Sequence, residues 1–332
     1  KGERKIKKDF NLKDFLINNG VIVVMIILVL YTGFTSNNFF TVKNFLNIAA
    51  NMSYRLVIAL GIAGCVITGG CDLSGGRMVG FAACISGTLL QNLDYSQKFF
   101  PGVEPLNPFL VILIVMVICG MFGAITGAFV AYLHVPPFIA TLGMMDIIYG
   151  LGLIYTGATP LGGFTRAYTT FSTGKFLGIS YLIWIALIVM AITWFIFNMT
   201  RHGKYMYAIG GNAQAAEVAG VPVNKTLVII YAKASAYFAL AGFMLGAKAG
   251  GSSVNTGLSY EMEGIAACAL GGVSVTGGRG KVSSALIGVA VLELLKAALQ
   301  YLGVDQNAQY IAIGIVILIA ITLDIRKYVQ KK

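Results

Sequence analysis

An acidic and a basic residue stand close together in the glycine-rich stretch TGGCDLSGGRMVG, where Asp72 precedes Arg77. The segments on either side of it are almost wholly apolar. A charged side chain at the centre of a bilayer costs about 2.5–3.5 kcal/mol, so such residues pair, face water or contact a substrate. Glycine permits backbone that leaves the helix, and a membrane tolerates such backbone only inside protein or beside a wet cavity. We therefore predict a structured turn, shielded from lipid, that contains Asp72, Ser74, Gly75, Gly76 and Arg77.

This turn has two interpretations. In the favoured one, Asp72 and Arg77 form a salt bridge at the end of a loop and pin two helices together. In the other, the two side chains contact a substrate directly. Both interpretations satisfy the rule that charged groups near lipid need a partner or a function.

A similar pattern returns in the second half of the chain, where GGVSVTGGR at 271–279 matches GGCDLSGGR at 69–77. Glycine-interrupted segments in corresponding positions of two halves are typical of transporters and indicate the transport path. The alternative is that two glycine-rich turns resemble each other by chance. An acid–base pair is not the shared feature, because Ser274 replaces Asp72. The candidate residues of the second turn are Thr276, Gly277, Gly278 and Arg279.

The composition identifies the elements that must position these turns. The 332-residue chain is 57% hydrophobic and only 11% charged, whereas soluble domains carry about 25% charged residues. Most of its surface must therefore contact membrane lipid. The net charge of +11 does not indicate a nucleic-acid partner, because the basic residues form no stripe beside aromatic residues.

Several apolar runs approach the length of about 20 residues that a membrane-spanning helix needs. They predict an all-α integral membrane protein with about ten transmembrane helices in a single polytopic domain, 1–332. The run at 262–275 is short and glycine-rich, and the region 55–93 could be divided differently. The runs are 19–35, 55–71, 77–93, 109–132, 137–157, 180–199, 226–247, 262–275, 282–302 and 309–325.

Lysine and arginine predict the orientation, because they concentrate on the cytoplasmic side of cell membranes. The segments 1–18 and 326–332 are both basic, so we expect both termini in the cytoplasm, which requires an even number of spans. The same alternation places the loop 200–225 and the turns with Arg77 and Arg279 on that side. An alternative topology with one reassigned hairpin remains open. The expected location is the inner, cytoplasmic membrane.

The loop 200–225 contains a helix signal outside the predicted spans. Asn212 is a good N-cap, AQAAEVA consists mostly of helix formers, and Gly220 supplies a stop. A helix of about two turns is marginal in water, so it needs a partner surface. Its small side chains suit insertion into a groove; alternatively, it packs on loops of its own chain. The candidate docking residues are Gly210, Gly211, Asn212, Ala215, Ala216, Glu217 and Gly220.

Enzyme chemistry has little support in this sequence. The nearest approach to a phosphate-binding loop is GRGKVSS, in which valine follows the lysine and the upstream glycine spacing fails. No H-E-x-x-H motif and no nucleophile–base pair is evident. We therefore expect a chain that is not an enzyme and holds no cofactor or metal of its own.

Three segments carry a resemblance to a known family. AIGGNAQAAEVAGVPV resembles the cytoplasmic coupling loop of the permease subunits of bacterial sugar ABC importers of the ribose/galactose class. ITGGCDLSGGRMVGFAA is similar to that family's T-x-G-x-DLS-x-GR-x-xG segment, and ALGGVSVTGGRG to its later glycine-rich segment. The similarity runs in order over nearly the whole chain. Cys71 departs from the pattern, because it stands where the family has threonine, which limits claims about hydrogen bonds in that turn.

The resemblance implies a permease that dimerises with a second copy and works with two partners. An ATP-binding subunit inside would hold ATP and Mg²⁺, and a sugar-binding protein outside would deliver a monosaccharide. Galactose or a methyl galactoside is favoured, with ribose, another pentose or a nucleoside as alternatives. Polar residues in apolar runs that could line the path, or could be structural, are Asn51, Tyr54, Gln91, Asp146, Glu261, Glu263 and Glu293.

Two other classes of transport protein compete with this interpretation. A secondary transporter would also show repeats and intramembrane acids, but the acids here are few and it would have no use for the helix outside the membrane. A channel would let the solute equilibrate without accumulation. Ion-driven uptake without an ATPase would favour the secondary transporter.

Overall fold

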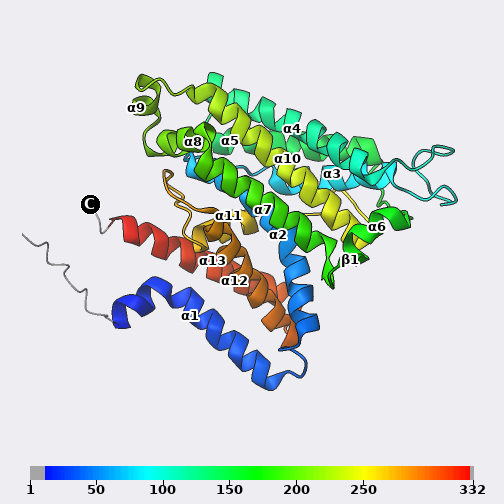
Figure 1. Ribbon diagram of the computed structural model, residues 1–332, viewed down its shortest axis with the longest axis horizontal. Helices are drawn as coiled ribbons and strands as arrows, with labels where there is room; N and C mark the ends of the chain where they lie inside the picture. Colours follow the sequence, from blue (N-terminus) through cyan, green and yellow to red (C-terminus); the bar gives the residue numbers. More distant parts are fainter. Residues whose placement is uncertain (1–11, 330–332) are drawn as a thin grey trace, which may run out of the picture.

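The computed structural model describes residues 12–329, and the chain there is a bundle of helices with one small hairpin (Figure 1). The predicted terminal segments 1–18 and 326–332 lie partly outside the described residues. The first elements in chain order are α1 (Leu12–Thr35), α2 (Val42–Ile67), α3 (Gly75–Leu89), α4 (Pro108–Tyr132), α5 (Pro137–Thr156), α6 (Arg166–Thr173), β1 (Lys175–Phe176) and β2 (Ile179–Ser180). The remaining elements are α7 (Tyr181–Met199), α8 (Arg201–Gly211), α9 (Ala213–Val218), α10 (Val223–Ala249), α11 (Tyr260–Leu270), α12 (Val282–Tyr301) and α13 (Gln306–Val329).

The prediction of an all-α membrane protein is confirmed, and the count of about ten spans is approximate. Six described helices are long and apolar enough to cross a membrane: α2, α4, α5, α7, α10 and α12. Shorter apolar stretches lie in α1 and α13. The other two runs form short helices, because α3 has 15 residues and α11 has 11. At 1.5 Å per residue they extend about 22 and 16 Å, less than the hydrocarbon thickness of about 30 Å.

The long helix α10 forms the centre of the bundle, where it packs on α4, α3 and α2. Glycine lets α4 approach it closely. A Cβ atom at Gly123 would collide with the carbonyl oxygen of Tyr231, and one at Gly127 would lie 2.7 Å from Cα of Val228. The pattern GAITG at 123–127 therefore places two helix backbones in contact, as small residues do in membrane bundles.

The two short helices meet inside the protein. The backbone folds back after α2, where the Gly70 N–H donates to the carbonyl oxygen of Cys65 at 3.0 Å. The first turn of α3 then lies against the start of α11: a Cβ at Gly75 would be 3.4 Å from that of Glu261, and one at Gly76 would collide with the Glu261 carboxylate. Glycine at the start of α3 is therefore required by a close helix contact.

The two ends of the bundle carry different elements. Figure 1 shows α8 and α9 at the same end as the beginning of α1 and the end of α13. The connection 90–107 and the hairpin β1–β2 with α6 lie at the opposite end. We call these the α9 end and the hairpin end. The assignment of the α9 end to the cytoplasm stays a prediction.

Candidate functional site

A polar cavity opens among α2, α11, α12 and α13. Its volume is about 390 Å³, within the usual range of ligand sites. It shares Asn51 and Gln300 with a wider cavity of about 1110 Å³, which Lys43, Lys175 and Lys248 also line. Because hairpin residues line this wider cavity, it lies toward the hairpin end, and we call the two adjoining cavities the vestibule. The polar and aromatic residues of the inner cavity are Asn51, Tyr54, Arg55, Tyr260, Glu263, Glu293, Lys296, Gln300, Gln306, Gln309 and Tyr310.

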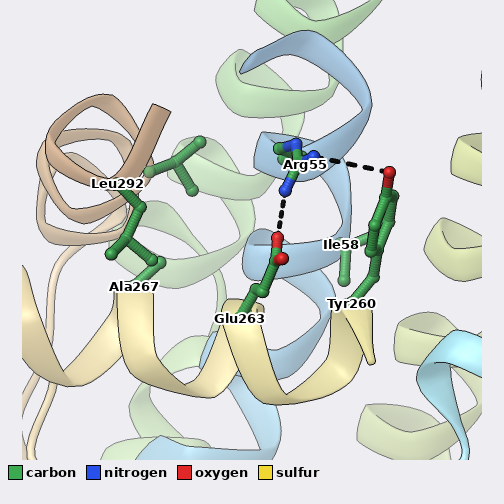
Figure 2. Close-up of a pocket in the computed structure, with 8 residues that line it drawn as sticks. Arg55, Ile58, Tyr260, Glu263, Ala267 and Leu292 are labelled. Atoms are coloured by element: carbon green, nitrogen blue, oxygen red, sulfur yellow. Dashed lines mark hydrogen bonds and ion pairs between the residues drawn. The ribbon is translucent and has the colours of Figure 1, made fainter. Parts of the chain in front are cut away.

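Four charged side chains form one network in this inner cavity. Arg55 on α2 pairs with Glu263 on α11, and its Nε lies 3.0 Å from Oε2 of Glu293 on α12. Lys296 donates to the other oxygen of Glu263 at 2.6 Å. Figure 2 shows the Arg55 guanidinium between the carboxylate of Glu263 and the hydroxyl of Tyr260. The network joins three helices and contains two positive and two negative groups.

Aromatic rings border the same charges. The rings of Tyr54 and Tyr260 are parallel within 12°, with centroids 6.0 Å apart. The Arg55 guanidinium lies 4.6 Å from the Tyr260 centroid, a cation–π distance. Lys248 on α10 donates to the side-chain oxygen of Asn51. The cavity therefore offers donors, acceptors and ring faces together, which is the set of groups that a polyhydroxylated ring with C–H faces can use.

The cavity ends where α2 meets α11. Beside the Arg55–Glu263 pair lies a space of only about 10 Å³, which these two residues line together with Ile58, Ala267 and Leu292 among others (Figure 2). Such a space holds about one water molecule. Closer to the α9 end, the Cys268 thiol contacts the Ala59 carbonyl at 3.3 Å and seals the two helices together. The vestibule is thus open toward the hairpin end and closed toward the α9 end.

The structure brings together only some of the residues expected to line a path. Asn51, Tyr54, Glu263 and Glu293 meet in the cavity, and they come from three helices. Arg55 and Lys296 were missed as site residues. Both are basic residues within apolar runs. A charged side chain inside the membrane is costly unless it has a partner or a function, and this could have identified them as site residues.

Three of the expected residues lie elsewhere. Gln91 fastens the connections at the hairpin end, because it donates to the Gly162 carbonyl at 2.9 Å and accepts from the Phe99 N–H at 2.8 Å. Glu261 lies beside the start of α3 and is only 7% exposed. Asp146 is exposed on α5. Glu261 and Glu263 have different surroundings because they are two residues apart in α11, so their side chains point to different sides of this helix.

The favoured salt bridge between Asp72 and Arg77 is wrong for the described residues. Asp72 is fully buried and instead accepts from the Ser74 N–H at 3.0 Å and the Ser74 hydroxyl at 2.6 Å. Arg77 donates to the side-chain oxygen of Asn255 at 2.9 Å and lies 3.9 Å from the Tyr149 ring centroid. Because Ser74 is only two residues from Asp72, its N–H and hydroxyl form a local turn with the carboxylate. The Arg77 side chain therefore bonds to other elements of the fold.

Arg77 lies in the first turn of α3 and contacts a segment far along the chain, while the side of the membrane on which it lies stays a prediction. Its partners Val254 and Asn255 belong to the segment that follows α10. Helix α10 has 27 residues and extends about 40 Å, so that segment begins at the hairpin end. Arg77 therefore lies within the bundle, because the backbone returns into the protein after α2.

The two glycine-rich turns are related but not superimposable residue by residue. Gly69 follows the cap of α2 with φ +79°, and the glycine in the same position after α11 is Gly272, with φ +95°. The sequence match would pair Gly69 with Gly271. Gly75 and Gly76 begin α3, whereas Gly277 and Gly278 have positive φ and precede α12. Elsewhere in the second turn, the hydroxyls of Thr276 and Ser274 lie 2.8 Å apart, and the Arg279 carbonyl accepts from the Ser274 N–H at 3.0 Å.

The helix predicted in the loop 200–225 is present as α9. The Asn212 side chain caps it by accepting from the Ala215 N–H at 2.9 Å, and Gly220 beyond it has φ +83°. Ala216 is only 5% exposed and faces its own chain, so α9 packs partly against the neighbouring helices α8 and α10. Val218 is 91% exposed, although it is apolar. The free face therefore contains Ala215, Glu217 and Val218 rather than Ala216.

Burial shifts the pKa of side chains in α8, which lies outside the long apolar helices, and it raises the pKa of Tyr207. Burial, and then the Lys233 ammonium, lower the pKa of His202 in α8 below its usual 6.5. The imidazole is therefore kept neutral at neutral pH. It lies near Lys233 of α10 as an uncharged group.

The fold and the cavity define a class, a membrane permease with a vestibule and a short helix outside the bundle. Sequence comparison agrees: residues 44–321 match the family described as branched-chain amino acid transport system / permease component. The chain belongs to this family of multi-pass membrane permeases. No solved structure matches it.

Relatives in the same family carry more specific names. The chain is 42% identical over 325 residues to the galactose/methyl galactoside import permease protein MglC of Escherichia coli strain K12, which covers 96% of this chain and 97% of the relative. It is 40% identical to the MglC protein of Haemophilus influenzae, over 96% of this chain and 97% of that one. The ribose import permease protein RbsC of E. coli K12 is 32% identical, over 95% and 96% of the two chains.

Proposed function

We propose that this chain is the permease subunit of an ATP-driven importer that moves a neutral monosaccharide, galactose or a methyl galactoside. The observation that carries the proposal is the cavity around Arg55, Glu263, Glu293 and Lys296 inside the helix bundle. Its four charges balance, so an anionic or cationic solute would leave one group without a partner, at a high energetic cost. A neutral solute with many hydroxyls can exchange hydrogen bonds with all four.

The inner cavity has room and chemistry for one sugar ring. Its volume of about 390 Å³ and the exposed ring of Tyr310, which also lines it, suit a ring whose C–H groups pack on aromatic carbon, while hydroxyls reach the charged groups. Relatives named for galactose and methyl galactoside support the choice of hexose over ribose.

The energy would come from a partner at the α9 end. Helix α9 is capped, stands outside the bundle and presents the exposed Val218 beside Glu217. A short helix with an exposed apolar tip suits a groove on another protein. We assign that groove to an ATP-binding subunit, which would hold ATP and Mg²⁺. A sugar-binding protein would deliver the solute at the hairpin end, where the vestibule opens.

A second copy of the permease and membrane lipid would cover the outer surface. Large apolar side chains such as Phe109, Ile154 and Phe195 are exposed on α4, α5 and α7. Such surface is stable only against lipid or another protein. The importer would therefore contain two permease chains in the inner membrane, with α9 facing the cytoplasm.

Reconstitution tests the proposal. The permease, its ATP-binding subunit and a sugar-loaded binding protein are placed in vesicles, and uptake of labelled galactose is measured with and without ATP. We expect ATP-dependent accumulation that unlabelled methyl galactoside inhibits more strongly than ribose. Stronger inhibition by ribose or a nucleoside would change the substrate. Accumulation driven by an ion gradient without the ATPase would identify a secondary transporter, and equilibration alone a channel.

Docking has its own test at the tip of α9. Val218→Glu places a charge on the exposed apolar tip and should prevent co-purification of the ATP-binding subunit, while membrane abundance stays normal. Val103→Glu is the matched control, because Val103 is an exposed valine in the connection 90–107 at the hairpin end. Glu217→Arg should weaken docking in a salt-dependent way. Normal co-purification of Val218→Glu would refute docking at this helix.

A further inference from the structure

The two glycine-rich turns and the segment that precedes α9 meet at one place. The Gly278 N–H donates to the carbonyl oxygen of Ile67, the last residue of α2, at 2.8 Å. Gly210, near the end of α8, lies against both of these groups. We call the contact of Ile67, Gly69, Gly210, Gly277 and Gly278 the glycine junction.

The junction has no space for side chains. A Cβ atom at Gly210 would collide with the Ile67 oxygen and lie 2.6 Å from the Gly278 nitrogen. A Cβ at Gly277 would lie 2.8 Å from the Gly210 oxygen and 3.1 Å from the Gly69 nitrogen. Three stretches of backbone therefore touch directly. Because close-packed backbone is hard to compress, movement of one stretch displaces the others.

The junction leads to the helices that close the cavity. Ile67 ends α2, which carries Arg55, and Gly277 and Gly278 connect α11, which carries Glu263, to α12. These helices hold the charged network and the packed region below it. On the other side, Gly210 is separated from α9 only by Gly211 and the cap Asn212.

A hydrogen bond reinforces the junction. Tyr207, one turn before Gly211 in α8, donates its hydroxyl to the Gly280 carbonyl at 2.8 Å. Helix α8 is thus attached to the α11–α12 connection at two points, by Tyr207 and by Gly210. Because α8 is attached at two points, a movement of α8 displaces the α11–α12 connection in a defined direction.

We propose that Gly210 is a positioning residue that transmits movement of α9 to the closed end of the transport path. When the docked subunit shifts α9, the glycine junction moves the end of α2 and the α11–α12 connection together. This displaces the ends of α2 and α11, and with them the packing that closes the path below the cavity, relative to the rest of the bundle. The proposal rests on the proposed docking of α9, and it assigns the transmission to backbone contact.

The chain offers a matched pair of variants. Gly210→Ala adds a methyl group that collides with the junction. Gly211→Ala adds the same group one residue later, where nothing lies within 4 Å; the structure places Gly211 at the end of α8 and not on the free face of α9 that is proposed to dock. Both residues end the same helix, so the two variants share the same gain in helix propensity. They differ only in the contact.

The decisive readout is the number of ATP molecules hydrolysed per sugar taken up, in vesicles that contain the complete importer. A merely structural defect would lower hydrolysis and uptake in proportion and leave this ratio unchanged. For Gly210→Ala we expect normal co-purification of the ATP-binding subunit and a ratio raised about tenfold. Gly211→Ala should have the wild-type ratio. Equal ratios for the two variants, with docking intact, would overturn the proposal.

Tyr207→Phe keeps the test decisive if Gly210→Ala does not reach the membrane. It removes one hydroxyl without adding volume, and we expect the ratio to rise about threefold. An unchanged ratio for Tyr207→Phe would then overturn the proposal. Failure of the proposed function is separate, because it would leave the wild-type protein without sugar-stimulated ATP hydrolysis.

Discussion

The carboxylate of Glu263 lies 2.6 Å from the ammonium of Lys296, although a glycine-rich connection separates α11 from α12. Its other oxygen pairs with Arg55 on α2. One acidic side chain therefore holds three helices at the floor of the vestibule. Any change that separates these helices must break or exchange these contacts.

Replacement of this acid should uncouple the three helices. Glu263→Gln removes the charge that Arg55 and Lys296 share, and loss of a charged hydrogen bond costs about 2 kcal/mol. We expect a lower thermal unfolding temperature in detergent and, because the same contacts hold the floor of the vestibule, uptake reduced about 30-fold, since each 1.4 kcal/mol is a factor of ten. Glu104→Gln, in the exposed connection 90–107, is the control. Wild-type uptake and stability for Glu263→Gln would contradict the role of the network.

The ring of Tyr310, which lines the cavity and is 59% exposed, should matter more than its hydroxyl. If a sugar packs on this face, Tyr310→Phe keeps most of the interaction and Tyr310→Ala removes it. We expect the half-saturating concentration for uptake to rise about tenfold in the alanine variant and to change little in the phenylalanine variant. The measurement is uptake against the concentration of loaded binding protein. Equal effects of the two variants would exclude stacking.

Arg77 should be important for the bundle and Lys98 should not. Arg77→Ala removes the hydrogen bond to Asn255 and the cation–π contact with Tyr149, together about 1–3 kcal/mol. Lys98 contacts only the Val103 carbonyl in an exposed connection. We expect less folded permease in the membrane for Arg77→Ala and normal amounts for Lys98→Ala. Near-normal amounts and uptake in both variants would refute this.

The orientation can be tested by labelling single cysteines. Ala215 is exposed on α9 and Gln97 is exposed at the hairpin end. A thiol reagent that does not cross membranes should label Gln97→Cys in intact cells and leave Ala215→Cys unlabelled until the cells are opened. The reverse result would invert the predicted topology.

His202 predicts a pH dependence of stability. Its pKa is lower in the folded protein than its usual 6.5, because burial and Lys233 disfavour the charged form. The neutral group therefore stabilises the fold above pH 6.5, and this stability is lost as the pH falls from 6.5 through the folded-state pKa. The unfolding temperature of His202→Gln should fall less between pH 7 and about pH 5.5 than that of the wild type. The exposed His134 offers the control His134→Gln, which should behave as the wild type does.

The sequence by itself determined the class of this protein. Apolar composition and run length identify a helical membrane protein, because lipid demands apolar surface and internally satisfied backbone. The cap at Asn212 and the stop at Gly220 predicted α9 correctly, since a cap depends on residues within one turn. The sequence also predicted the close helix contact at 123–127, because small side chains directly control the distance between helices.

Only the tertiary structure decided the partners of the charged residues and the meeting of the turns. Asp72 and Arg77 are close in sequence, yet one caps a local turn and the other joins a segment after α10. Arg55, Glu263 and Lys296 come from three helices, and Gly210 reaches Ile67 and Gly278 from a third part of the chain. Such contacts depend on how helices pack and on where backbone folds back after α2. Spacing along the sequence predicts neither the helix packing nor this reversal of the backbone, because residues distant along the chain meet only after the bundle has formed.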